Sequence, residues 1–139
     1  MLFRSFRPGD ANEVAETYRA VMQRPDRPAV IVLSRQNIPT LDRTGLGAAS
    51  GTAKGAYVLK DAPNGRPACI LIGTGSELQL CLDAAAKLAE AGVHARVVSM
   101  PSWDLFDEQD AAYKESVLPA AITARVACEA ACEIGRAHV

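Results

Sequence analysis

The sequence has 139 residues, of which 49% are hydrophobic and 22% are charged. A chain of this length can bury roughly 70% of the surface that its unfolded form exposes, so it can build one core of ordinary size but hardly two. Its 15 Lys and Arg residues balance 16 Asp and Glu residues, and neither sign forms a block. This charge pattern gives no indication of a nucleic-acid or anionic-membrane surface.

The apolar segments are too short to cross a membrane. The longest, such as residues 29–33 and 69–72, are strand-sized, whereas a membrane-spanning helix needs roughly 20 apolar residues. Residues 1–4 lack the long apolar core of a secretory signal. We therefore expect no membrane partner and a cytoplasmic location.

Four cysteines are scattered through the chain instead of clustering at metal-ligand spacings. Cys128 and Cys132 could share a helix face, but no histidine pair accompanies them, so we do not expect a metal site. The cysteines are interpreted as small core residues with free thiols. Free thiols agree with a reducing compartment.

The first expected element is a helix over residues 10–24. Apolar residues recur there at helical spacing, and Asp10 is placed to cap the first turn. Pro25 and Pro28 end this helix, and residues 29–33 then read as a buried β-strand.

A linker is expected between residues 36 and 54. This stretch is rich in glycine and small residues and has no apolar period, which is typical of a segment that runs over a surface between domains. Asp42 and Arg43 could pin it by ionic contacts.

A β-α-β unit follows a short strand at residues 55–60. Residues 68–73 form a continuous apolar strand, a helix with a wide apolar face comes next, and Gly92 stops it. Residues 94–100 supply the second strand, so these two strands should be parallel with a right-handed crossover.

A helical region then opens at residues 101–104, where Ser102 and Asp104 can each act as a cap, and it ends at Pro119. Residues 123–129 read as a third, central strand of the parallel sheet. The whole pattern predicts an α/β fold. It consists of a three-layer, parallel-sheet, Rossmann-like C-terminal domain preceded by a helix-strand remnant of a second α/β domain.

Two further features have structural interpretations. Gly73 and Gly75 at a strand-to-helix turn suggest a phosphate cradle, but the full dinucleotide spacing is absent, and Thr74 with Glu77 fits a capping box instead. The acidic residues between positions 104 and 110 look like a solvated helix face.

The most informative segment for function is the polar cluster of residues 34–37, which directly follows the strand at residues 29–33. Such loops carry ligand contacts in α/β proteins. Arg35 presents a planar fork of donors that suits a phosphate or carboxylate, and Ser34 can help to fix a hydroxyl-rich substrate. From chemistry alone, an ion pair or a loop cap explains Arg35 equally well.

A family resemblance covers the chain from about Phe6 to about Glu129. Five sequence motifs, in their order along the chain, resemble the last part of a transketolase. They are VLSRQNIPTLDR, GAYVLKD, ILIGTGSELQL, HARVVSMPSWDLFDEQ and YKESVLP. Transketolases transfer a two-carbon ketol unit from a ketose phosphate to an aldose phosphate in the pentose phosphate and Calvin pathways. They are homodimers that hold thiamine diphosphate and Mg²⁺ between two subunits, and the cofactor supplies the carbanion chemistry.

The resemblance implies a division of the chain. Residues 1–43 resemble the end of the pyrimidine-binding domain, residues 44–54 a linker, and residues 55–139 the C-terminal domain. Arg35 matches the arginine of the SRQN word, which binds the phosphate of the sugar substrate in the family. Ser34 is a weaker candidate for the same substrate.

The remaining machinery of the family is not found in this sequence. The Mg²⁺ motif, the glutamate that activates the aminopyrimidine and the active-site histidines are all missing, so we expect no catalytic, cofactor-binding or metal-binding residue here and no activity of the chain alone. We also expect a truncated C-terminus. Residues 133–139 resemble the translation of a sequencing adapter, and a Gly-Trp segment of the family is lacking.

The sequence leaves two alternatives open. The chain could be a non-catalytic C-terminal module for dimerisation or regulation, or a fragment of a dihydroxyacetone synthase. The SRQN and SMPSW words favour transketolase over the β subunits of 2-oxo acid dehydrogenases but do not exclude dihydroxyacetone synthase.

Overall fold

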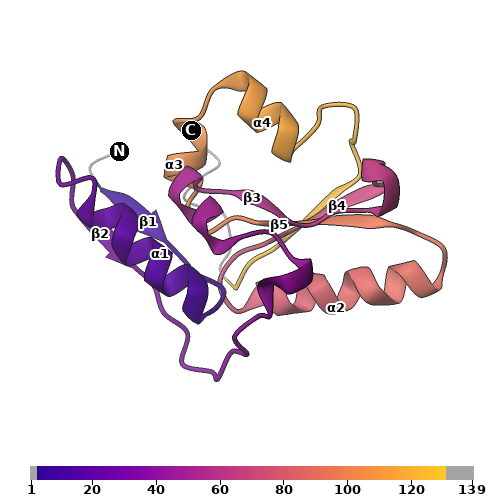
Figure 1. The fold of residues 1–139 in the computed structure, drawn as a ribbon, viewed down its shortest axis with the longest axis horizontal. Coiled ribbons are helices and arrows are strands. Elements are labelled where there is room, and N and C mark those ends of the chain that lie inside the picture. The colour runs from indigo at the N-terminus through magenta and orange to yellow at the C-terminus, as the bar shows by residue number, and fades with distance from the viewer. Residues whose placement is uncertain (1–2, 131–139) are drawn as a thin grey trace.

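The chain forms two β-sheets, each with its own helices, in a computed structural model that describes residues 3–130 (Figure 1). The smaller sheet pairs β1 (Arg4–Phe6) with β2 (Ala29–Ile31) in parallel. The helix α1 (Ala11–Met22) connects these two strands. The larger sheet has four strands in the order β3-β5-β4-β6.

The N-terminal unit matches the expected helix but differs from the expected strand. Asp10 caps α1 by accepting a hydrogen bond from the Glu13 amide at 2.8 Å, as predicted. The prediction of a buried strand at residues 29–33 is wrong in its burial, because Val30 is 45% exposed and Leu33 is 55% exposed. Within the described part of the chain, β2 has only β1 as a neighbouring strand. The strand β1 is three residues long, too short to show a period.

The larger sheet is mixed. Its strands β4 (Cys69–Gly73), β5 (Ala95–Ser99) and β6 (Arg125–Cys128) are parallel, which confirms the predicted parallel set. The remaining strand, β3 (Tyr57–Lys60), runs antiparallel to β5, an orientation that the sequence did not reveal. A short 3₁₀ turn, η3 (Pro63–Gly65), leads from β3 towards β4.

Helices cover both faces of this sheet, which confirms the three-layer arrangement. Figure 1 shows α2 (Glu77–Glu90) below the sheet and α4 (Ala111–Val117) above it. Side chains alternate along β4, so that Leu71 packs towards α2 while Ile70 and Ile72 join the cluster that contains Phe106 of α3 (Trp103–Asp107).

The predicted helical region after residue 101 is two helices instead of one. Ser102 caps α3 as predicted, at 3.4 Å from the Leu105 amide, but Asp104 does not act as a cap. A new helix, α4, starts at Ala111, and its N-cap residue Asp110 accepts a hydrogen bond from the Tyr113 amide at 2.7 Å.

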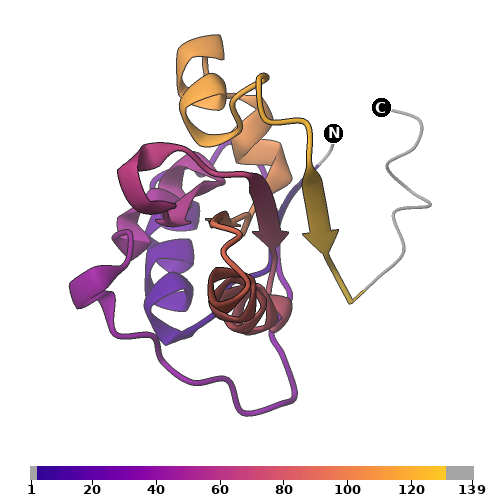
Figure 2. The same ribbon diagram turned by 90° about the vertical axis from the view of Figure 1, so that its right-hand side faces the viewer.

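The strand β6 lies at the edge of the sheet among residues 3–130, not at its centre as predicted. Figure 2 shows it, in gold, on the outer side of the sheet. Three of its four residues are exposed, and Val126 retains 53% of its accessible surface.

The segment between the two sheets is less extended than a typical linker. It contains two 3₁₀ helices, η1 (Arg43–Gly45) and η2 (Ala49–Lys54), and η2 packs against α1. Arg43 forms the predicted ionic contact, with its Nη2 atom 2.9 Å from Asp10 Oδ1. Asp42 instead caps η1 locally through the Thr44 amide at 2.9 Å.

No helix in the described range 3–130 has the length and apolar character that a membrane span requires.

Candidate functional site

The carboxyl ends of strands from both sheets converge on one crevice. A cavity of about 220 Å³ lies there, lined by Arg7 and Pro8 after β1, residues 32–36 after β2, residues 75–77 at the start of α2, and Ala130 after β6. In open α/β sheets, ligands bind outside the carboxyl ends of the strands. The fold therefore provides a position for a ligand at the edge where the sequence predicted one.

Arg7 joins the two sheets at this crevice through its backbone. Its amide donates to the Pro101 carbonyl at 2.7 Å, and its carbonyl accepts from the Gly75 amide at 3.0 Å. The Arg7 guanidinium pairs with Glu77 at 3.2 Å. The walls of the cavity are thus held together by main-chain bonds and one ion pair.

Arg35 lies on the rim of this cavity with its side chain exposed. Within residues 3–130 its guanidinium makes no hydrogen bond or ion pair, so neither of the structural alternatives for Arg35 is observed there. The neighbouring Ser34 hydroxyl is hydrogen-bonded to the Gln36 side chain and also accepts from the Gln36 amide at 3.2 Å. This local turn orients the loop, and the Arg35 side chain stays exposed.

The expected capping box at Thr74 and Glu77 is wrong. The helix α2 starts at Glu77, and its N-cap residue is Ser76, which makes no side-chain capping bond. Gly75 has a φ of +61°, and this turn shifts the start of the helix. Glu77 directs its carboxylate to the Ser76 hydroxyl at 2.7 Å and to Arg7.

A buried carboxylate that sequence reasoning did not assign connects α1 to the larger sheet. Glu13 of α1 is fully buried. One of its oxygens accepts from the Tyr57 hydroxyl at 2.6 Å and from the Ser99 hydroxyl at 2.5 Å, and the other accepts from the Gly9 amide at 2.6 Å. Burial and the neighbouring Glu13 carboxylate raise the pKa of Tyr57 far above its ordinary value, so Tyr57 remains a proton donor.

The spacing of Asp10 and Glu13 was a signal for this arrangement. It is the D-x-x-E pattern of a capping box, and here the Glu13 side chain returns to the Gly9 amide, next to the cap residue. The long-range partners Tyr57 and Ser99 had no such local signal.

The acidic residues between positions 104 and 110 do more than face solvent, contrary to the prediction. Asp104 Oδ2 accepts from both the amide and the hydroxyl of Ser5, at 2.7 and 2.9 Å. Glu108 lies 3.5 Å from the Arg4 guanidinium. These contacts attach the smaller sheet to α3.

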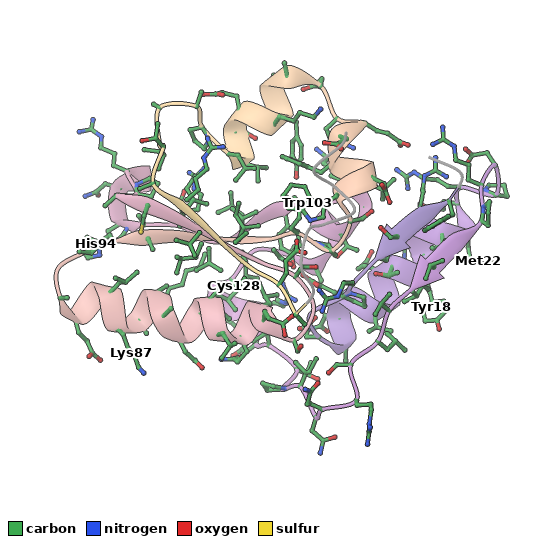
Figure 3. All side chains as sticks on the ribbon, turned by 180° about the vertical axis from the view of Figure 1, so that it is seen from behind. Tyr18, Met22, Lys87, His94, Trp103 and Cys128 are labelled. Atoms are coloured by element: carbon green, nitrogen blue, oxygen red, sulfur yellow. The ribbon has the colours of Figure 1, made fainter. Side chains whose placement is uncertain are left out.

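The described residues offer no group of three or more His, Cys, Asp or Glu side chains that could hold a metal ion. His94 is exposed, and Figure 3 shows it at the end of the larger sheet away from the crevice. Cys132 and residues 133–139, which include His138, lie outside the described residues.

Comparisons with known proteins give a consistent result. The family model described as "Transketolase-like TK C-terminal domain" matches residues 55–139. The transketolase of Geobacillus stearothermophilus is 46% identical over 129 residues, which cover 93% of this chain and 19% of that protein. The chloroplastic transketolase of Solanum tuberosum is 47% identical over 131 residues, which cover 94% of this chain and 17% of the relative.

Solved structures agree in fold. The transketolase of Pichia stipitis in complex with sedoheptulose-7-phosphate superposes with a TM-score of 0.85 at 32% identity, covering 97% of this chain and 19% of that one. The chain therefore spans about a fifth of the length of these relatives.

Proposed function

Because this chain belongs to the transketolase family, we propose that it is a segment of a transketolase and supplies part of the substrate site of the full-length enzyme. That enzyme would transfer a two-carbon ketol unit from a ketose phosphate to an aldose phosphate. Residues 1–43 would end its pyrimidine-binding domain, residues 44–54 would be a linker, and residues 55–139 would belong to its C-terminal domain.

In this proposal Arg35 binds the phosphate of the sugar substrate. The observation that carries it is the exposed guanidinium at the carboxyl end of β2, which lies on the rim of the crevice and has no partner within residues 3–130. The Pichia relative was solved with a sugar phosphate, and a planar guanidinium can bind phosphate through two charge-assisted hydrogen bonds. Ser34 lies on the same rim, but its hydroxyl is engaged with Gln36, so we assign it a smaller contribution.

The cofactors would be held elsewhere. Thiamine diphosphate supplies the carbanion chemistry when bound, with Mg²⁺ holding its diphosphate. We propose that other parts of the full-length enzyme hold Mg²⁺, because this sequence lacks the Mg²⁺ motif of the family. We therefore assign no step of the reaction to this chain through the cofactor, and we propose that the chain is inactive alone and acts within a homodimer.

The cytoplasm remains our proposed location. The unpaired thiols of Cys69 and Cys81 support a reducing compartment, although the Solanum relative is a chloroplastic protein. The reported matches are transketolases. Nothing in them favours a dihydroxyacetone synthase fragment or a free-standing dimerisation or regulatory module.

The test of Arg35 uses the full-length context. Residues 6–129 replace the matching segment of the Geobacillus stearothermophilus transketolase, and steady-state kinetics compare a ketose phosphate with the same ketose lacking phosphate. We expect R35Q to raise KM for the phosphorylated ketose about 10- to 150-fold, since a charged hydrogen-bonded pair contributes roughly 1.5–3 kcal/mol. The unphosphorylated ketose should be unaffected.

The matched control is R66Q, which removes the same charge from an exposed arginine in the loop after η3. It should leave both substrates unchanged. The proposal is wrong if the unmodified graft lacks ketol transfer, or if R35Q changes the two substrates equally.

A further inference from the structure

The loop that carries Arg35 is fastened at both ends. At its start, the Val32 amide donates to the Phe6 carbonyl at 2.8 Å, which extends the pairing of the smaller sheet. At its end, the Leu41 amide donates to Asp10 Oδ2 at 3.1 Å. The side chains of residues 33–37 between these points are exposed, so the two anchors set the course of the loop.

The second anchor depends on Asp10, whose side chain is fully buried, with 0% exposure. Its two carboxylate oxygens have separate partners. Oδ1 caps α1 at the Glu13 amide and pairs with Arg43. Oδ2 accepts from the Leu41 amide and, at 3.2 Å, from the Asn12 side chain. One oxygen thus serves the helix and the 3₁₀ segment, and the other serves the end of the Arg35 loop.

Asn12 completes the anchor by binding the other main-chain group of Leu41, its carbonyl. Its Nδ2 atom donates to the Leu41 carbonyl at 3.1 Å while also contacting Asp10. Both main-chain groups of Leu41 are therefore held by side chains of the first turn of α1. A hydrogen-bonded main chain at this point restricts the conformations open to the preceding residues.

We propose that Asp10, assisted by Asn12, is a positioning residue for Arg35. By fixing Leu41, it holds the loop of residues 33–40 in the conformation that presents the guanidinium to the substrate phosphate. A loop ordered before binding loses less conformational entropy when the ligand arrives, so its affinity is higher. This inference rests on the proposed function of Arg35.

The test is D10N in the same graft. Asparagine remains a good N-cap residue, but its amide nitrogen replaces Oδ2 and sets a donor against the Leu41 amide. We expect KM for the phosphorylated ketose to rise about 2- to 10-fold, the effect of one hydrogen bond. The value of kcat and the kinetics of the unphosphorylated ketose should remain unchanged.

Two further variants separate positioning from a general loss of structure. N12A removes the hydrogen bonds of Asn12 to the Leu41 carbonyl and to Asp10 Oδ2, but it leaves the bond between Asp10 Oδ1 and the Glu13 amide in place. It should raise the same KM by a smaller factor. D110N makes the same chemical change at the N-cap of α4, which lies on the opposite side of the molecule from the segment after β2 (Figure 1). It should leave both substrates unchanged. If D10N fails to fold, N12A decides the question.

The outcomes distinguish this inference from the proposed function. If R35Q discriminates between the two ketoses while D10N and N12A do not, the positioning role is overturned and the phosphate site stands. If R35Q does not discriminate, the proposed function fails, and the inference fails with it.

Discussion

At the scale of single residues, the environment of Glu13 departs most from what its type suggests. A glutamate is rarely buried unless its oxygens are paired, and here both oxygens accept hydrogen bonds from three different segments. Arg43 extends the network by donating to the Tyr57 hydroxyl at 2.7 Å. The carboxylate therefore serves as a shared acceptor between α1, β3 and β5.

The substitution E13Q tests this role. Glutamine keeps one acceptor oxygen, so either the Gly9 amide or the two hydroxyl donors must lose their partner. An unsatisfied buried donor costs about 1–3 kcal/mol, and we expect the free energy of unfolding to fall by that amount in urea titrations. The control E90Q, at an exposed position near the end of α2, should have little effect. If E13Q and E90Q changed the free energy of unfolding equally, the hydrogen-bond network of Glu13 would not contribute to stability.

At the scale of elements, the junction of η2 and β3 packs tightly on the start of α3. Gly55 has a φ of +87°, and an added Cβ atom there would collide with the backbone of Ser102 and Phe106. The Gly55 carbonyl also accepts from the Ser102 amide at 2.9 Å. Glycine is therefore required here for two reasons. The positive φ disfavours other residues, and the neighbouring backbone leaves no room for a Cβ atom.

Comparing G55A with G92A separates these two causes. Gly92 has a similar φ of +79°, but an added Cβ atom would meet nothing within 4 Å. We expect G92A to lower the free energy of unfolding by about 1 kcal/mol, the cost of a left-handed conformation for alanine. G55A should lower it by roughly a further 1–3 kcal/mol through overpacking. Thermal or urea unfolding measures the free energy of unfolding of both variants. Similar decreases would show that the backbone around Gly55 moves to make room for the Cβ atom.

At the scale of the whole molecule, the small sheet is docked on the large one mainly through polar contacts. Asp104 binds Ser5, and Arg4 contacts Glu108 beside its ion pair with Asp26 at 3.0 Å. One small apolar cluster, formed by Phe6, Ala20 and Leu105, supports these contacts. On the far side, Figure 3 shows Tyr18 and Met22 pointing away from the rest of the molecule, and they are 54% and 79% exposed.

Removing the Asp104 carboxylate should therefore destabilise the smaller sheet and α1 more than the larger sheet and α2. In D104A, the main-chain and hydroxyl donors of Ser5 lose their acceptor, so hydrogen exchange of the amides in α1 and β1 should accelerate while that of α2 stays constant. D107A, on the same helix at an exposed position, serves as the control. A uniform change across α1 and α2 would show that the two units do not open separately.

The sequence by itself determined the elements with a strong local period or clear boundaries. These are α1 with its Asp10 cap, the β4-α2-β5 unit and the parallel strand β6. It also placed Arg35 at the end of a strand and supplied the words that resemble the transketolase family, because an apolar run and the polar residues that follow it are visible without any distant contact.

Only the tertiary structure decided the features that depend on residues far apart in the chain. Glu13 binds Ser99, which is 86 positions away, and Ser5 binds Asp104, which is 99 positions away. Neither pair is indicated by any periodic pattern in the sequence. The same origin explains the antiparallel direction of β3, the edge position of β6 among residues 3–130 and the anchoring of Leu41 by Asp10. A local pattern reports which face of an element is apolar, whereas the partner of a buried polar group is set by how the elements pack.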